Sequence, residues 1–422
     1  MRRGLELGPA SVGVDAWGVD FGLLDARGRL LANPVHYRDS RTDGLLDVLF
    51  ERIARAGVFS ATGIQFMPIN TSVQLLSQTL GHDPLLAAAS KLLLIPDLMH
   101  MWFCGSQVSE YTNATTTQLY DQAANGWSGT MLSAIGIDAA LMPEVVAPGT
   151  TIGEYEGLSV IAPATHDTAS AVAAVPARNT DFAYVSSGTW SLVGLELEGP
   201  RTGPDALSAN VTNEGGVAGT TRLLKNVMGL WVLQQCATRW GAIDYREVVR
   251  AACEAPPLRA TVDVDHPDFL HHGDHVETLQ RHCRRRGGAV PESLGEVARA
   301  VFESLAFAYR RALERVETVA GRTASVVHLV GGGARNALLC QLTAEATGRP
   351  VVAGPAEATA LGNAGVQLLG LGHLGSLTEL RDHVRRAVRL RHHQPLGPRW
   401  AWEDAYARWC DANSVDAARE DR

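Results

Sequence analysis

The segments Thr165-His166-Asp167-Thr168 and Ser186-Ser187-Gly188-Thr189-Trp190 are the two stretches from which the fold of this chain can be worked out. Apolar, strand-like runs precede them at residues 158–162 and 182–185, so each turn is predicted to follow a β-strand. The first turn puts a carboxylate beside a histidine. The second is made of small residues whose backbone amides and hydroxyls can hold a phosphate. Together they predict phosphoryl transfer to an alcohol, although two ordinary β-turns would look the same in isolation.

The composition bounds the class of protein. The 422 residues suffice for two domains, and 46% hydrophobic with 19% charged residues is typical of a globular chain. A net charge of −8 without a basic stripe disfavours nucleic-acid binding. Six cysteines without CxxC spacing and no apolar run of about 18 residues favour a cytoplasmic protein with reduced thiols and no membrane span. A monomer or a homodimer is expected.

The first half of the chain predicts strands followed by helices. The strands are expected at 11–15 and 19–24, with 29–32 closing a hairpin on the second of them. From about residue 40 to 145 the apolar spacing favours helices, including 73–80 and 85–94. Residues 171–178, which contain Pro176, are a natural hinge between domains.

The second half predicts a more regular alternation of strands and helices. Strands are expected at 182–185, 190–195, 326–330 and 351–353, and helices after Glu292 and at 337–347 and 360–369. The helix after Glu292 carries one continuous apolar stripe, which predicts that it covers a core. Residues from Asp411 onward resemble a frayed polar tail.

Further segments, taken in order, resemble the FGGY family of carbohydrate kinases in the actin-like sugar-kinase superfamily. Besides the two turns they are Asp15–Asp25, His36–Arg41, Gly63–Phe66, Tyr111–Gln118, Asn213–Gly216, Leu224–Trp231 and Gly331–Asn336. The resemblance runs from Ser11 to about Gly370 and implies an α/β fold of two actin-like (ribonuclease H-like) domains. These would be a sugar-binding domain at 1–175 and a nucleotide-binding domain at 176–375, which close over sugar and Mg²⁺-ATP, followed by a C-terminal extension at 376–422.

The resemblance also implies roles for individual residues. Asp167 would be the catalytic base, a role that contributes about 10²- to 10⁴-fold in rate. The implied sugar contacts are Gly18, His166, Thr168 and Asn226, and the implied ATP contacts are Thr189, Gln234, Gly331, Gly332 and Gly333. Three of these have plainer interpretations that remain open: His166 as a packed core histidine, Asn226 as a helix cap and Gln234 as an exposed helical side chain.

Other residues are weaker candidates. Trp17 and Phe21 could form an apolar wall for a deoxysugar methyl group or could simply be core, and Asp39 and Arg41 could recognise sugar or form a surface turn. His271-His-Gly-Asp-His275 has the composition of a metal site, but neighbouring histidines point apart, so no protein-bound metal is predicted there.

The chain departs from the family in one respect. Family members open with a strand–turn–strand that carries an Asp-x-Gly phosphate loop, and this sequence starts beyond it, so the first domain is expected to be N-terminally truncated as written. We expect that the natural protein begins further upstream; the alternative is an inactive relic.

The resemblance implies ATP-dependent phosphorylation of L-rhamnulose to L-rhamnulose 1-phosphate, with Mg²⁺ accompanying ATP. Two alternatives stay open: another ketose such as L-fuculose, and a non-catalytic pseudokinase. A small sugar is the expected partner.

Overall fold

The computed structural model describes Glu6 and residues 8–420, with side chains as far as Asn413. These residues form two compact units. The first holds the chain up to Arg178 together with Glu196–Leu224 and Ala358–Ala387, and the second holds Asn179–Leu195, Lys225–Glu357 and the chain from Val388 onward.

Short strands organise the first unit. β9 (Leu158–Ala162) lies between β1 (Ser11–Val12), to which it is parallel, and β8 (Thr150–Tyr155), to which it is antiparallel. The other pairs are β2 (Phe21–Leu24) with β3 (Lys91–Leu94), β4 (Ser109–Glu110) with β7 (Val145–Val146), β5 (Tyr120–Asp121) with β6 (Gly126–Trp127), and β12 (Thr212–Gly215) with the start of β13 (Thr221–Met228).

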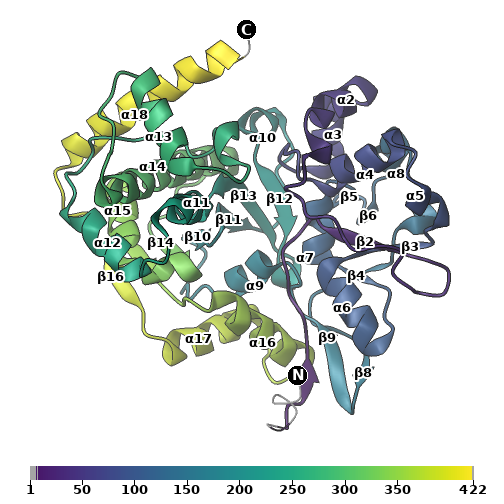
Figure 1. Ribbon diagram of the computed structural model, residues 1–422. Helices are drawn as coiled ribbons and strands as arrows, with labels where there is room; N and C mark the ends of the chain where they lie inside the picture. The colour runs from purple at the N-terminus through teal and green to yellow at the C-terminus, as the bar shows by residue number, and fades with distance from the viewer. Residues whose placement is uncertain (1–5, 7, 421–422) are drawn as a thin grey trace. The chain divides into compact units, whose positions relative to one another are not determined.

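Helices cover these strands. They are η1 (Ser40–Thr42), α2 (Leu45–Arg52), α3 (Arg55–Thr62), α4 (Thr71–Leu80), α5 (Pro84–Ala88), α6 (Ile95–Cys104), α7 (Tyr111–Ala114), η2 (Thr115–Thr117), α8 (Gly129–Ile135), η3 (Ala139–Leu141), α9 (Asp167–Ala173), α10 (Pro204–Ala209), η4 (Val217–Gly219), α16 (Ala358–Gly370) and α17 (Leu377–Ala387). α9 and α16 lie side by side (Figure 1), because Gly362 lets the backbone of α16 approach that of Ser170.

The second unit is built on a sheet with the strand order β11-β10-β14-β15-β16. Its strands are β10 (Ala183–Ser187), β11 (Trp190–Leu197), β14 (Val327–Val330), β15 (Val351–Ala353) and β16 (Arg391–His393). β10 is antiparallel to β11 and parallel to β14, which is parallel to β15. The turns that follow β10 and β14 therefore leave the same edge of the sheet.

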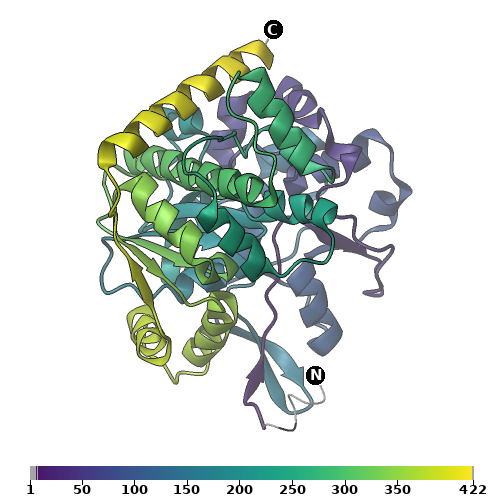
Figure 2. The same ribbon diagram turned by 60° about the vertical axis from the view of Figure 1, so that its left-hand side comes forward.

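Its helices are α11 (Trp231–Trp240), α12 (Tyr245–Glu254), η5 (Pro267–Phe269), α13 (His275–Arg285), α14 (Leu294–Ala320), η6 (Gly332–Arg335), α15 (Ala337–Thr347) and α18 (Arg399–Glu420). Ser293 and Glu296 form a capping box that starts α14, and Gly321, in the left-handed conformation, ends it. Phe307 of α14 contacts Trp402, Tyr406 and Trp409, which fixes α18 along α14 (Figure 2).

Most of the predicted elements are present, and α15 and β15 have the predicted bounds. Two predictions were wrong. Residues 85–94 are not one helix: α5 ends at Ala88, and the buried leucines of β3 pair with β2. The expected hairpin is present in short form: Leu24 bridges Leu30 in antiparallel fashion, and the Leu31 amide donates to the Leu23 carbonyl at 2.9 Å. The expected polar tail is helical, since α18 continues to Glu420.

All six cysteines carry free thiols. Within the described part of the chain, every helix is too short or too polar to cross a membrane.

Candidate active site

The backbone before Gly18 runs beside the Thr165–Thr168 turn in the first unit. Beyond the β1–β9 pairing, the amide of Ala16 donates to the Thr165 carbonyl, and the amide of Asp167 donates to the Ala16 carbonyl, both at 2.9 Å. Two of the motifs recognised in the sequence are thereby brought together.

Asp167 is the first residue of α9 and is accessible to a substrate. Its side chain is 45% exposed, with Oδ1 3.6 Å from His166 Nε2 and 3.2 Å from the Thr168 hydroxyl, which donates to it. The amides at the start of the helix favour a negative charge there. A second carboxylate, Asp15, lies nearby and pairs with the Asn363 amide. Burial raises the pKa of Asp15, and the charge of Asp167 adds to that rise while Asn363 opposes it.

Glu110 is fully buried, and its carboxylate fixes the Thr165–Thr168 turn from the interior of the unit. Its carboxylate accepts hydrogen bonds from the amide and hydroxyl of Thr112, at 2.8 and 2.6 Å, and from the amide and hydroxyl of Thr165, at 2.8 and 2.9 Å. The Thr112 hydroxyl also accepts from the His166 amide at 3.3 Å. Burial raises the pKa of Glu110, although these four bonds lower it.

His166 is held by an ion pair of the β12–β13 hairpin. Glu214 and Arg222 are direct cross-strand partners, with Glu214 Oε2 3.1 Å from Arg222 Nη2. His166 Nδ1 lies 3.1 Å from the same Nη2 atom and 3.3 Å from the same Oε2 atom. Burial raises the pKa of Glu214, but Arg222 and His166 outweigh it, so the pKa lies below its usual value.

The backbone at Gly18 is crowded and strained. A Cβ atom at Gly18 would lie 2.8 Å from the Thr116 hydroxyl, so the close neighbour that requires glycine is protein. Val19 has a φ of 68°, rare for a β-branched residue. Its carbonyl accepts hydrogen bonds from the Thr71 hydroxyl at 2.7 Å and the Gln74 amide at 3.3 Å. These bonds hold a conformation that costs about 1–3 kcal/mol.

The weaker candidates for sugar contacts differ in how exposed their side chains are. Trp17 is 45% exposed and donates through Nε1 to Asp20, so it remains a possible apolar wall, whereas Phe21 is buried in β2 and belongs to the core. Asp39 caps η1, and Arg41 donates to Gln74 at 2.7 Å.

In the second unit, the turns after β10 and β14 touch. A Cβ atom at Gly333 would lie 2.1 Å from the Ser187 hydroxyl, and one at Gly331, where φ is 80°, would lie 2.9 Å from the Ser187 carbonyl. Gly332 has open space around its Cβ position. Ser187 is held in turn by the Tyr309 hydroxyl at 3.3 Å. Glycines at the start of a strand-to-helix turn leave backbone amides accessible to phosphate.

The remaining predicted contacts also occupy defined places. Thr189 is exposed, and its carbonyl accepts from the amides of Gly229 and Trp231, both at 3.1 Å. Gln234 is exposed on α11. Asn226 lies half-buried within β13, so its interpretation as a helix cap is wrong.

Four residues of the first unit were not assigned roles from the sequence: Asp15, Glu110, Glu214 and Arg222. A usable signal existed for one pair, because Glu214 and Arg222 flank the turn-like run Gly215–Thr220 at distances that place them opposite each other in a hairpin. Glu110 gave no such signal, since its partners in the Thr165 segment are 55 residues away.

A group of possible metal ligands lies in the second unit. His266, Asp268 and His282 place one ligand atom each within 4.8 Å of one another, a set different from the His271–His275 segment. However, the Asp268 amide donates to His266 Nδ1, and Arg281 pairs with Asp268 at 2.9 Å. These contacts use the ligand atoms within the protein and favour a structural cluster.

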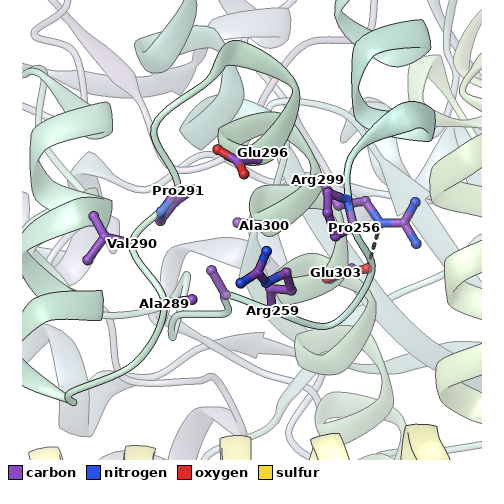
Figure 3. Close-up of a pocket in the computed structure, with 10 residues that line it drawn as sticks. Pro256, Arg259, Ala289, Val290, Pro291, Glu296, Arg299, Ala300 and Glu303 are labelled. Atoms are coloured by element: carbon purple, nitrogen blue, oxygen red, sulfur yellow. Dashed lines mark hydrogen bonds and ion pairs between the residues drawn. The ribbon is translucent and has the colours of Figure 1, made fainter.

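A pocket of about 90 Å³ lies in the second unit and is lined by residues between Pro256 and Glu303 (Figure 3). Its charged wall includes Arg299, which binds Glu303 at 2.6 Å. This lining is distinct from all the residues predicted to contact sugar or ATP.

The fold is shared with solved sugar and glycerol kinases. The ligand-bound xylulose kinase from Lactobacillus acidophilus superimposes with a TM-score of 0.80 at 16% identity, covering 97% of this chain and 85% of that one. A Plasmodium falciparum glycerol kinase with ADP gives a TM-score of 0.75 at 13% identity, covering 99% and 86%. At these identities the likeness shows the fold alone, an α/β sugar-kinase fold of two domains.

Sequence comparisons extend further. The chain is 42% identical over 407 residues to a rhamnulokinase of Bacteroides thetaiotaomicron, covering 94% of this chain and 84% of the relative. It is also 42% identical over 396 residues to a rhamnulokinase of Klebsiella pneumoniae, covering 91% and 81%. Residues 7–160 match the N-terminal domain of the FGGY family of carbohydrate kinases, and residues 183–371 match its C-terminal domain. The chain therefore belongs to the FGGY family of carbohydrate kinases and is an ATP-dependent sugar kinase.

Proposed function

We propose that this chain phosphorylates L-rhamnulose to L-rhamnulose 1-phosphate. The proposal is supported by rhamnulokinase relatives that are 40–42% identical over more than nine tenths of the chain. The structural observation that carries it is Asp167, an exposed carboxylate at the start of a helix, next to a histidine with a defined orientation.

Asp167 acts as the general base. As the sugar hydroxyl oxygen forms a bond to the γ-phosphorus of ATP, its proton passes to the Asp167 carboxylate. The bond from that phosphorus to the oxygen bridging to the β-phosphate breaks, and ADP leaves. Gly18, His166, Thr168 and Asn226 orient the sugar. Trp17, whose indole is half exposed, is a suitable surface for the methyl group of a 6-deoxyketose.

The second unit binds the nucleotide in this proposal. Thr189, Gln234 and the run Gly331–Gly333 contact ATP, and the open space around Gly332 supports the approach of a phosphate there. Mg²⁺ bound together with ATP would neutralise part of the phosphate charge. The carboxylates of Asp15 and Asp167, whose charges act on each other, would suit a divalent cation nearby, and no side chain is assigned as its ligand.

We also propose the broader assignments made from the sequence: a sugar-binding part at 1–175, a nucleotide-binding part at 176–375, a C-terminal extension at 376–422, and a cytoplasmic location as a monomer or homodimer. An upstream Asp-x-Gly loop stays a prediction.

A panel of ketoses with an ADP-release assay tests the substrate. L-rhamnulose should give a kcat/KM at least about tenfold above L-fuculose and D-xylulose, the discrimination available to pocket contacts with small groups. Equal rates for all ketoses would contradict the rhamnulose assignment. ATP binding without turnover of any ketose would favour the pseudokinase alternative.

A further inference from the structure

The hydrogen bonds around His166 determine which of its two ring nitrogens can carry a proton. Nδ1 faces Arg222 Nη2 at 3.1 Å and Glu214 Oε2 at 3.3 Å, while Nε2 faces Asp167 Oδ1 at 3.6 Å. Asp15, whose pKa is affected by the charge of His166, is a further charged group near the ring.

The Arg222 guanidinium has only donors, so an N–H on His166 Nδ1 would face a donor at 3.1 Å and would have only the more distant Glu214 Oε2, at 3.3 Å, as an acceptor. A bare Nδ1 accepts from Arg222 instead. Glu214 Oε2 lies 3.1 Å from the same Arg222 Nη2 atom, and its ionic attraction keeps the guanidinium in place. Both side chains are almost fully buried, at 5% exposure for Glu214 and 0% for Arg222, which limits any other arrangement.

We propose that Arg222, held by Glu214, is a positioning residue that fixes His166 as the tautomer with its proton on Nε2. The Nε2–H group then lies beside Asp167 at a distance too long for a strong hydrogen bond to it. It is available to donate to a sugar oxygen next to the hydroxyl that Asp167 deprotonates. This role rests on the proposed function for its substrate, but the tautomer itself can be measured without substrate.

The first experiment is ¹⁵N NMR on protein labelled at histidine, with His166→Gln used to identify the His166 resonances. The expected result is a bare Nδ1 and a protonated Nε2 in the wild type. A wild-type His166 protonated on Nδ1 alone would overturn the proposal.

The second experiment removes the ion pair without leaving a buried charge. The double variant Arg222→Met/Glu214→Leu replaces both members with apolar side chains, an exchange that buried pairs often tolerate. Loss of the Arg222 donor should allow the other tautomer and raise the KM for the ketose about tenfold, the effect of one misplaced hydrogen bond, with the KM for ATP within about twofold. Arg222→Lys retains the charge but not the planar donor geometry, and it should give an intermediate result.

A matched control is the pair Arg381 and Glu196, which is similarly buried in the same unit, with Arg381 Nη2 2.9 Å from Glu196 Oε2. The variant Arg381→Met/Glu196→Leu should alter thermal stability but leave the His166 resonances and the ketose KM unchanged. Unchanged resonances and ketose KM in Arg222→Met/Glu214→Leu would refute the positioning role. A wild type inactive on every ketose would instead refute the proposed function and leave the tautomer measurement valid.

Discussion

Several side chains of the first unit position the turn that carries Asp167. Glu110 ties down Thr112 and Thr165 from the interior, and the Glu214–Arg222 pair holds His166 from β12 and β13. Each of these groups is buried, and each interacts with the turn or with its ion-pair partner inside the fold. The position of Asp167 is therefore set by neighbours that never need to touch substrate.

His100 makes stability depend on pH. It lies in α6, its Nε2 accepts a hydrogen bond from the Val14 amide at 3.0 Å, and burial lowers its pKa from 6.5 to about 4. Between pH 6.5 and about pH 4, His100 is protonated in the unfolded chain but neutral in the folded chain. The free energy of unfolding therefore decreases as the pH falls through this range. At pH 5 the loss is about 2 kcal/mol.

Denaturant unfolding of the wild type and His100→Gln at pH 7.5 and pH 5.0 measures this effect. Gln keeps an acceptor but does not titrate, so the variant should lose about 2 kcal/mol less than the wild type on acidification. An equal loss in both proteins would show that His100 is not the group responsible.

Roles could be assigned from the sequence to residues in local motifs, but not to residues that act through contacts remote in the chain. Asp167 and the glycines at 331–333 stand in local motifs, so their neighbours along the chain reveal their chemistry. Glu110 and Arg222 gain their roles from contacts with the Thr165–Thr168 turn, 55 and 56 residues away along the chain, which no local pattern records.

At the scale of elements, the turn between β14 and α15 offers two adjacent glycines with opposite surroundings. Gly332→Ala meets open space, so the fold should tolerate it, whereas Gly333→Ala meets the Ser187 hydroxyl and should cost about 1–3 kcal/mol. If ATP phosphates approach Gly332, its variant should keep its melting temperature while the KM for ATP rises several-fold. Thermal melts and steady-state kinetics check both, and an unchanged KM in a stable Gly332→Ala protein would remove Gly332 from the ATP site.

The pairing of α9 with α16 depends on one small residue. A Cβ atom at Gly362 would lie 1.7 Å from the Ser170 carbonyl oxygen, so Gly362→Ala must separate the two helices. We expect a loss of about 3 kcal/mol in stability, together with reduced activity because α9 carries Asp167. Gly129→Ala, at the start of α8 with nothing within 4 Å, is the matched control and should unfold like the wild type. A stable Gly362→Ala protein would contradict this packing.

Helices and strands could be predicted where the residues that start and end them are adjacent in the sequence. α15 begins after Asn336, whose side chain caps it, and ends at Gly348, and its bounds were predicted correctly. The run Leu85–Leu94 was misread because its apolar residues suit a helix as well as a strand, and only pairing with β2 distinguishes them. α18 was missed because its aromatic contacts with Phe307 are remote in sequence.

At the scale of the whole molecule, the chain divides its chemistry between two units. The first contains the proposed base and most of the sugar contacts, and the second contains the turns and α11 residues proposed for ATP, together with Asn226. Loss of the base should therefore leave nucleotide binding intact.

The most direct test of this account is Asp167→Asn, assayed for phosphoryl transfer to the ketose and for ATP affinity, beside Asp47→Asn on the exposed face of α2 as a control. We expect a fall in kcat of about 10²- to 10⁴-fold for Asp167→Asn, ATP affinity within about twofold of the wild type, and no change for Asp47→Asn. Undiminished turnover by Asp167→Asn would contradict this account.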